Sequence, residues 1–425
     1  MIAEYRTFLN PKKIYLPLTD NDSKVSNLSV EEGDRVLVGQ VVSYKINEKT
    51  KTPILSTISG TVVGFEDKTD RYSKIVKHIV IENDLLNEST ESINLKVKAA
   101  QNRPRNFPKN VTTYKNNLSA AQVRNQLTSL GIDKVAVDGL YTDISFSGAI
   151  KHVVLNAVFT NEPFISTDYE LIIHNAEDIV DGICLLGTAG ETKSLTVIVD
   201  RFMPAEALEE LGKATVDRDI ELVTIDVKKV TAWDYKIIKK LVKKDLNINL
   251  LEDGVVYTSI QTALMVHNAI RKGLPIVKRQ VAIIGDGLKV NVVYDVRVGT
   301  SFLDLVNDLD GYQDIENMNI HIGSFLTGIQ LDTDDFAITQ TIDSINVSEY
   351  RKAEEDVCIK CGDCNDICPA GILPQNIMDA ELKDANSRII DLDTHLCVEC
   401  GLCTYVCPSK INVLKWVRRA KRRVG

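Results

Sequence analysis

This 425-residue sequence contains very little cysteine over most of its length. Residues 1–357 hold a single cysteine, Cys184, and the other eight lie between Cys358 and Cys407. The N-terminus also lacks an apolar stretch followed by a small-residue cleavage site, so we expect the protein to stay in the reducing cytoplasm, where disulfides are rare. The clustered cysteines are therefore better candidates for a metal site than for disulfide bonds.

Long apolar runs and a net positive charge are absent as well. No stretch approaches the roughly 18 consecutive apolar residues of a membrane-spanning helix, so we expect no transmembrane segment. The chain has 50 Lys and Arg against 59 Asp and Glu, a formal charge of -9, which argues against nucleic acid as a partner. The expected location is the cytoplasm, with peripheral attachment to the inner face of the cell membrane if the chain belongs to a membrane complex.

The N-terminal part has the pattern of a small β domain, which we expect over residues 1–100. Short β-type segments are broken by turn signals, and residues 30–42 and 58–66 resemble the two halves of a lipoyl- or biotinyl-type barrel-sandwich domain. In carriers of that type a lysine between the halves is modified. Three lysines lie in that region without the flanking residues that modification needs: Lys45, Lys49 and Lys51. A structural, unmodified barrel is therefore expected.

The pattern changes twice more before the cysteines. Over residues 110–275 apolar strands alternate with helical segments, which predicts an α/β domain with a mostly parallel sheet. One predicted helix begins near Asp168 and carries Cys184 at the edge of its apolar stripe, where a small core residue fits. Residues 276–347 return to β-type sequence around one short helix, an order that fits a small β-grasp domain.

The tail, residues 348–425, contains an internal repeat. The run Cys358-Ile-Lys-Cys361-Gly-Asp-Cys364-Asn-Asp-Ile-Cys368-Pro recurs 39 residues later as Cys397-Val-Glu-Cys400-Gly-Leu-Cys403-Thr-Tyr-Val-Cys407-Pro. This C-x2-C-x2-C-x3-C-P spacing is the bacterial run for a [4Fe-4S] cluster. Three thiolates can surround one cluster only if the backbone between them turns tightly, which glycine permits at positions 362 and 401. Structural zinc is the alternative, but its sites use two C-x2-C pairs and suit these quartets poorly.

In proteins with two such runs, the fourth cysteine of each run ligates the other cluster. The predicted ligands of the first cluster are therefore Cys358, Cys361, Cys364 and Cys407. The predicted ligands of the second cluster are Cys397, Cys400, Cys403 and Cys368. The sequence thus predicts a helical ferredoxin-type domain with two [4Fe-4S] clusters.

With these motifs in hand, the chain resembles the C subunit of the Rnf electron-transport complex over nearly its whole length. Residues 161–168 (NEPFISTD) are similar to the C-E-P-Y-I-T-x-D segment of that family, and residues 177–183 (EDIVDGI) are similar to its E-I-V-E-G-I segment. The resemblance implies four units: the barrel-sandwich hybrid, an α/β domain like the flavin- and NADH-binding subunit of respiratory complex I, a β-grasp soluble-ligand-binding domain, and a dicluster ferredoxin. Soluble relatives include the electron transfer protein associated with D-proline reductase.

The sequence departs from this family at the loop that binds FMN and NADH. The family has G-G-A-G-F-P-T there, whereas residues 135–142 read VAVDGLYT, so that only Gly139 and Thr142 match. Such loops need glycine so that backbone N–H groups can approach phosphate or flavin closely. The family also places polar residues in and just before the segment that matches residues 161–168, and Glu162 is the one that this sequence retains. It is either a ligand or a surface carboxylate. These three residues are the weak candidates for a flavin or NADH site.

Two functions of different classes follow. In the first, the chain is an electron-transfer protein that passes single electrons through two clusters to a partner oxidoreductase or a membrane complex. In the second, it is an NADH-oxidising flavoenzyme subunit, because a flavin must mediate between a hydride and one-electron centres. The altered glycine loop favours the first, so whether the chain is itself an enzyme stays open. The expected partners are redox proteins: a ferredoxin, a flavoprotein or a partner reductase.

The C-terminal residues are strongly basic. Residues 410–425 contain seven Lys and Arg and no acidic residue, and Trp416 lies among them. On a helix these cations could meet anionic lipid or an acidic partner. The plainer interpretation is a helix end exposed to water.

Overall fold

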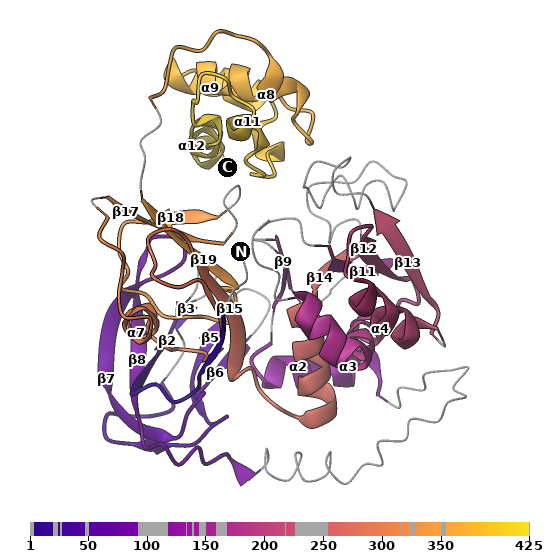
Figure 1. Cartoon of the computed structure of the whole chain (residues 1–425), viewed down its shortest axis with the longest axis vertical. Helices are drawn as coiled ribbons and strands as arrows, with labels where there is room; N and C mark the ends of the chain where they lie inside the picture. The colour runs from indigo at the N-terminus through magenta and orange to yellow at the C-terminus, as the bar shows by residue number, and fades with distance from the viewer. Residues whose placement is uncertain are drawn as a thin grey trace.

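The computed structural model describes residues 4–19, 24–25, 28–46, 51–91, 118–132, 134–137, 140–143, 150–158, 168–216, 218–225, 254–315, 317–323, 328–349 and 354–424. Four bodies follow one another along the chain, and the last stands apart from the other three at one end of the molecule (Figure 1). Among the described helices, none combines the length and the apolar character that crossing a bilayer requires.

The N-terminal body is built from two small antiparallel sheets. The strands of the first are, in spatial order, β2 (Lys13–Pro17), β8 (Ile75–Asn83), β7 (Gly60–Thr69) and β4 (Arg35–Val36). Those of the second are β3 (Lys24–Val25), β5 (Val41–Ile46) and β6 (Lys51–Leu55). Alternate residues such as Ile14 and Leu16 on β2, and Ile79 and Ile81 on β8, fill a common core. A sheet with one face buried produces this period-2 pattern.

The first strand of the chain departs from the expected barrel. β1 (Glu4–Phe8) lies within residues 1–100 but pairs in parallel with β16 (Val292–Arg297), nearly 300 residues later. It thereby becomes one edge of a six-stranded sheet. Phe8 packs against the core of that sheet and lies edge-on to the ring of Tyr294, 6.4 Å between centroids. Local sequence carries no signal for such a distant pairing.

The remainder of that sheet comes from the third body. Its strands follow β1 in the spatial order β16, β15 (Lys278–Ile284), β19 (Ser344–Glu349), β17 (Met318–Ile322) and β18 (Ile329–Leu331). Helix α7 (Phe302–Asp308) covers the sheet and contributes Phe302, whose ring stacks on Phe336 with 4.7 Å between centroids. The helix thus buries its apolar face on the sheet, as the sequence indicates.

The second body has the parallel sheet that alternating strands and helices predict. Its strands are, in spatial order, β13 (Ile220–Ile225), β12 (Leu195–Asp200), β11 (His152–Ala157) and β14 (Val255–Ser259), and every neighbouring pair is parallel. The helices around it are α2 (Ala120–Ser129), α3 (Asp168–Ala189), α4 (Ala205–Thr215) and α6 (Ile260–His267), the last continued by the π-helical turn η1 (Asn268–Lys272). A separate hairpin consists of β9 (Lys134–Val137) and β10 (Leu140–Asp143).

Helices α3 and α6 approach each other unusually closely. A Cβ atom on Gly182 would lie 2.0 Å from the backbone oxygen of Ala263, so this position on α3 requires glycine. Ile179 and Ile183 of α3 are buried in the same core cluster as Ala263 of α6. The backbone of α6 therefore occupies the space that a side chain at position 182 would fill.

The C-terminal body consists of short helices around the cysteines. These are α8 (Asp363–Asp366), α9 (Pro374–Leu382), α10 (Asn386–Asp391), the 3-10 turn η2 (Thr394–Leu396), α11 (Leu402–Tyr405) and α12 (Val413–Val424). Ile377, Ile389 and Val417 form its core together with several of the cysteines. In Figure 1, α11 and α12 lie on the side of this body nearer the rest of the molecule, whereas α8 and α9 lie on the far side.

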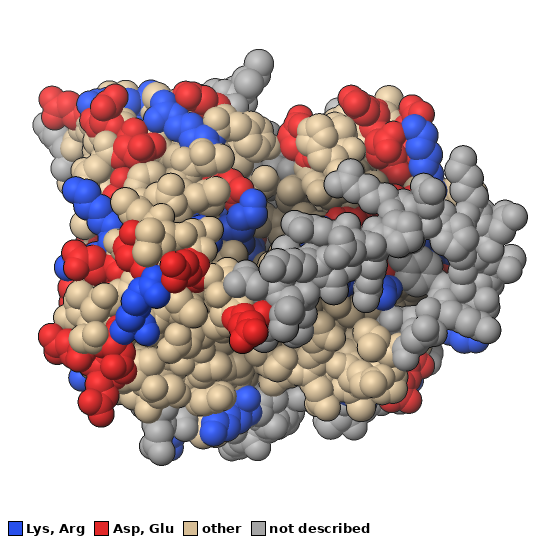
Figure 2. Space-filling model, turned by 90° about the horizontal axis from the view of Figure 1, so that it is seen from below, with Lys and Arg blue, Asp and Glu red and all other residues tan. Residues whose placement is uncertain are grey.

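The face of the molecule opposite the C-terminal body has a mixed charge. Figure 2 shows acidic and basic side chains interspersed there among the residues that the structure describes.

Candidate metal centre

The two cysteine runs fold into loops of the same shape. In the first loop Lys360 and Gly362 have φ angles of 57° and 90°, and in the second Glu399 and Gly401 have φ angles of 55° and 76°. Each glycine directly precedes a one-turn helix, α8 or α11. The left-handed backbone at the glycines is the tight turn that the spacing of the motif predicts.

The loops bring the eight cysteines together in two cavities. The first cavity is lined by Cys358, Cys361, Cys364 and Cys407. The second is lined by Cys368, Cys397, Cys400 and Cys403. Each cavity therefore receives three cysteines from one run and the last cysteine of the other.

The donor set suits a metal cluster. Burial raises the pKa of Cys400 to about 11 and that of Cys403 to about 12. Buried thiolates are costly without a compensating cation, and bound metal supplies one. Apolar side chains complete the walls: Met378, Ile411 and Val413 in the first cavity, and Ile372, Leu414 and Val417 in the second. Across the described ranges, no three His, Cys, Asp or Glu residues are placed to hold a single metal ion.

An ion-pair network at the second loop was not foreseen from the sequence. The carboxylate of Glu399 accepts hydrogen bonds from Arg418 Nε at 2.8 Å and from Lys421 Nζ at 3.2 Å. Lys421 Nζ also donates to the backbone oxygen of Cys397 at 2.7 Å. Helix α12 thereby holds the second loop in place. One difference within the repeat could have indicated this network: Lys360 in the first loop and Glu399 at the equivalent position of the second have opposite charges.

A second network absorbs two more of the C-terminal cations. Glu381, on α9, has a fully buried side chain and faces Arg419 Nε at 2.7 Å and Arg423 Nη1 at 3.3 Å. Its oxygens accept no hydrogen bond of good geometry within the described part of the chain, so these ion pairs alone compensate the charge. Four of the seven basic residues therefore form ion pairs within the domain, although Arg419 and Arg423 among them remain exposed. Contact of this helix with anionic lipid or an acidic partner stays a prediction.

The three weak flavin or NADH candidates do not form a described site. Gly139 and Glu162 lie outside the described residues, and Thr142 is described only for its backbone, in β10. β9 and β10 pair as an antiparallel hairpin, with Val137 opposite Leu140 and Val135 opposite Thr142. The strand pairing uses backbone groups that an open phosphate loop would present to its ligand.

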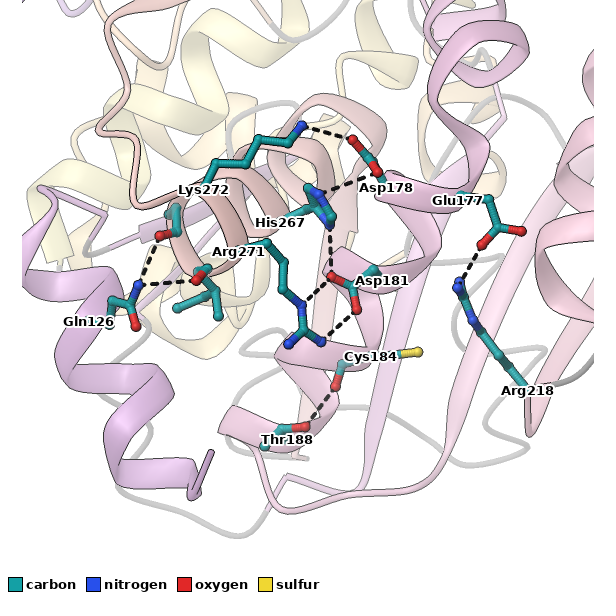
Figure 3. Close-up of polar contacts among 12 residues, drawn as sticks. Gln126, Glu177, Asp178, Asp181, Cys184, Thr188, Arg218, His267, Arg271 and Lys272 are labelled. Atoms are coloured by element: carbon teal, nitrogen blue, oxygen red, sulfur yellow. Dashed lines mark hydrogen bonds and ion pairs between the residues drawn. The ribbon is translucent and has the colours of Figure 1, made fainter. Parts of the chain in front are cut away.

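The segment at residues 177–183 has a clear structural role. Asp181 is buried, and its carboxylate lies 2.7 Å from His267 Nδ1 and 2.8 Å from both Arg271 Nε and Nη2 (Figure 3). Asp178 bonds Lys272 Nζ at 2.9 Å and lies 3.3 Å from His267 Nε2. These contacts, together with Gly182, fasten α3 to α6 and to the π-helical turn after it.

Cys184 lies one turn farther along α3 and takes no part in the cavities (Figure 3). Burial raises the pKa of its thiol to about 11. The residue is partly buried, and its role as a small core residue stays a prediction.

Two family models match the chain. Residues 3–85 match the RnfC barrel sandwich hybrid domain, and residues 357–411 match a 4Fe-4S dicluster domain. The two matches cover the N-terminal barrel and the loops that carry the eight clustered cysteines.

Curated relatives extend the similarity to most of the chain. The C subunit of the Na(+)-translocating ferredoxin:NAD(+) oxidoreductase complex of Acetobacterium woodii is 24% identical over 86% of this chain and 81% of that protein. The C subunit of the ion-translocating oxidoreductase complex of Serratia proteamaculans is 27% identical over 88% of this chain and 52% of that protein. The match covers 43% of the corresponding protein of Haemophilus influenzae strain Rd, so the chain spans about half the length of several relatives.

Among solved structures, an NAD+-reducing [NiFe]-hydrogenase in the H2-reduced state is similar with a TM-score of 0.49 and 12% identity, over 77% of this chain and 65% of that one. The family models and the curated relatives confirm the resemblance expected from the sequence. The chain is an electron-transfer protein similar to the C subunit of the Rnf complex, with a 4Fe-4S ferredoxin-type domain in residues 357–411.

Proposed function

We propose that the protein relays single electrons through two [4Fe-4S] clusters, one in each cysteine-lined cavity. The ligands of the first would be Cys358, Cys361, Cys364 and Cys407. The ligands of the second would be Cys368, Cys397, Cys400 and Cys403. The observation that carries the proposal is the exchange of the fourth cysteine between the two loops. Clusters of this type take up and release one electron at a time, which suits a relay rather than a hydride reaction.

The partners would be other redox proteins. The relatives are named as subunits of ion-translocating oxidoreductase complexes, which supports a place for this chain at the periphery of a comparable assembly, on the cytoplasmic side of a membrane. In this proposal residues 276–347 form a β-grasp domain of the soluble-ligand-binding type. Its support is the chain order of two strands, helix α7 and three further strands.

Metal analysis of the anaerobically purified protein tests the proposal. We expect about eight iron and eight sulfide per chain, with a broad visible absorbance that dithionite bleaches. A protein that holds only zinc, or about four iron after anaerobic reconstitution, would contradict it.

The second candidate function is an NADH-oxidising flavoenzyme subunit. The observation that favours it is the name of the relatives, which includes ferredoxin:NAD(+) oxidoreductase. The antiparallel pairing of β9 with β10 weighs against it, because backbone groups paired between strands are not free to bind a phosphate. Yellow, fluorescent flavin in the anaerobically purified protein would favour this candidate over the relay.

A further inference from the structure

The internal repeat places two copies of one loop in different surroundings. In the first loop Val357 is 80% exposed, Ile359 is 67% exposed and Cys361 is exposed. The equivalent residues of the second loop are partly or fully covered: Leu396 and Val398 are intermediate, and Cys400 is only 8% exposed. Since the sequence motif is the same, the difference comes from what packs against each loop.

The second loop is covered by α12. Leu414 and Val417 line its cavity, and Arg418 and Lys421 hold Glu399. On the same side, a groove lined mostly by residues of α11 and α12 is also lined by His321 and Gly328 of the β17–β18 region. The second cavity therefore lies beneath α12, on the side of the C-terminal body that faces the β17–β18 region.

The first loop is fixed in position but uncovered. Asp356 N donates to the backbone oxygen of Ser409 at 3.0 Å, and Ser409 Oγ donates to the backbone oxygen of Val357 at 3.0 Å. These bonds fix the backbone on both sides of Val357 while its side chain stays in water. Val357 and Ile359 thus stay exposed beside Cys361, where they contribute little to the folded core. Exposed apolar side chains gathered in this way indicate an interaction surface.

The charges around the first loop indicate the kind of partner. Five acidic residues on or beside the loop are exposed: Glu354, Glu355, Asp356, Asp363 and Asp366. Among the described residues there, two basic residues are exposed, Lys360 and Lys410. The surface is thus apolar at its centre and acidic at its rim. The basic residues of the domain gather instead on α12, which covers the other cavity.

We propose that Val357, Ile359 and Cys361 form the electron port of this protein, where a small one-electron carrier protein docks with basic side chains around its cofactor. This inference rests on the proposed function and assigns the partner contact to the first cavity. A docking surface centred on three side chains suits a transient redox complex, whose partners meet through small interfaces. Opposite charges at the rim would steer the encounter and make its rate depend on salt.

Stopped-flow electron transfer from the dithionite-reduced holoprotein to cytochrome c, a carrier with lysines around its haem edge, tests the port. We expect the variant Glu354→Lys/Glu355→Lys to lower the second-order rate constant about tenfold at low salt. The difference should fade as added salt screens the charges. Ile359→Asn should lower the rate at both low and high salt, because it removes an apolar contact.

The control variant is Glu206→Lys/Glu221→Lys, which makes the same charge change at exposed positions on α4 and β13. We expect it to change the rate less than twofold. EPR spectra of all variants should match the unmodified protein, which shows that the cavities are intact. Ferricyanide, a small anion, should react faster with the Glu354→Lys/Glu355→Lys variant, because the added positive charge attracts it.

Three results would overturn the inference. Equal rates for Glu354→Lys/Glu355→Lys and the control Glu206→Lys/Glu221→Lys, with intact EPR signals, would contradict docking at the first loop. The proposed function would be unaffected. A faster reaction when exposed cations of α12 are reversed, as in Lys415→Glu/Arg422→Glu, with an unchanged rate for Glu354→Lys/Glu355→Lys, would move the port to the second cavity, because the new carboxylates would attract the lysine-rich carrier there. Absence of cluster signals from the unmodified protein would instead contradict the proposed function and, with it, this inference.

Discussion

At the scale of single residues, Cys368 distinguishes crossed from separate ligation. It belongs to the first run in sequence but lines the second cavity. We therefore expect Cys368→Ser to perturb the EPR signal of the cluster held by Cys397, Cys400 and Cys403 and to leave the other signal mostly intact. Cys184→Ser, which alters a partly buried cysteine outside both cavities, should leave both signals unchanged. Loss of the first signal in Cys368→Ser would mean that each run holds its own cluster.

The buried carboxylate of Glu381 allows a second test at this scale. Replacing Arg419 and Arg423 by alanine leaves that carboxylate buried without its cations, so we expect the domain to lose about 3 to 5 kcal/mol of stability. Adding Glu381→Gln to the same variant should restore most of the loss, because it removes the uncompensated charge. Urea unfolding of the holoprotein, followed by loss of cluster absorbance, measures both effects.

The control for that cycle is Arg422→Ala, which removes an exposed cation that forms no ion pair with a described residue. It should change stability by less than about 0.5 kcal/mol. If the Glu381→Gln addition gave no rescue, packing of the arginine side chains rather than their charge would hold α12 to α9.

At the scale of elements, the contact between α3 and α6 depends on the absence of a side chain at Gly182. In Gly182→Ala the added Cβ would lie 2.0 Å from the oxygen of Ala263, so the helices must separate and we expect a loss of about 1 to 3 kcal/mol. Gly212→Ala on α4 is the matched control, because its Cβ would meet no atom within 4 Å. That change should be neutral or stabilising by up to about 1 kcal/mol. Chemical denaturation monitored by circular dichroism compares the two, and equal effects would contradict the close approach.

The elements also show what the sequence can and cannot predict. The strands of the parallel sheet and helix α3 follow from local patterns, because each buries one apolar face. The cysteine cavities follow from spacing, since the loop geometry is set within a dozen residues. By contrast, the pairing of β1 with β16 and the burial of Asp181 depend on residues far away in the chain. Local periodicity gives no sign that Asp181 is buried, because its partners, His267 and Arg271, lie more than 80 residues farther along the chain.

At the scale of the whole molecule, the two cavities differ in what lies beside them. The second cavity lies beneath α12, on the side of the C-terminal body that faces the β17–β18 region, and the first cavity opens to solvent beside Val357 and Ile359. In the proposed relay, an electron would enter on one of these sides and leave on the other. This arrangement suits a relay between two proteins whether or not the α/β domain holds a nucleotide.

The final prediction concerns that nucleotide. A glycine loop holds phosphate through several unobstructed N–H groups, each charge-assisted bond being worth about 1.5 to 3 kcal/mol. In this chain Val137 and Leu140 pair with each other in a hairpin at the corresponding place, so we expect at least two such bonds to be missing. Because about 1.4 kcal/mol corresponds to a tenfold change, a cofactor bound at micromolar concentration would shift to the millimolar range.

The isolated protein, with its clusters intact, should therefore neither retain FMN nor reduce ferricyanide with NADH, yet it should accept electrons from a reduced ferredoxin or flavoprotein. Calorimetric titration with FMN and with NADH, and a steady-state assay with each donor, measure these expectations separately. Sub-micromolar FMN binding together with rapid NADH oxidation would show that residues 135–142 build a working site in another way. The flavoenzyme function would then replace the relay, because a hydride donor needs a flavin before its electrons can reach one-electron centres.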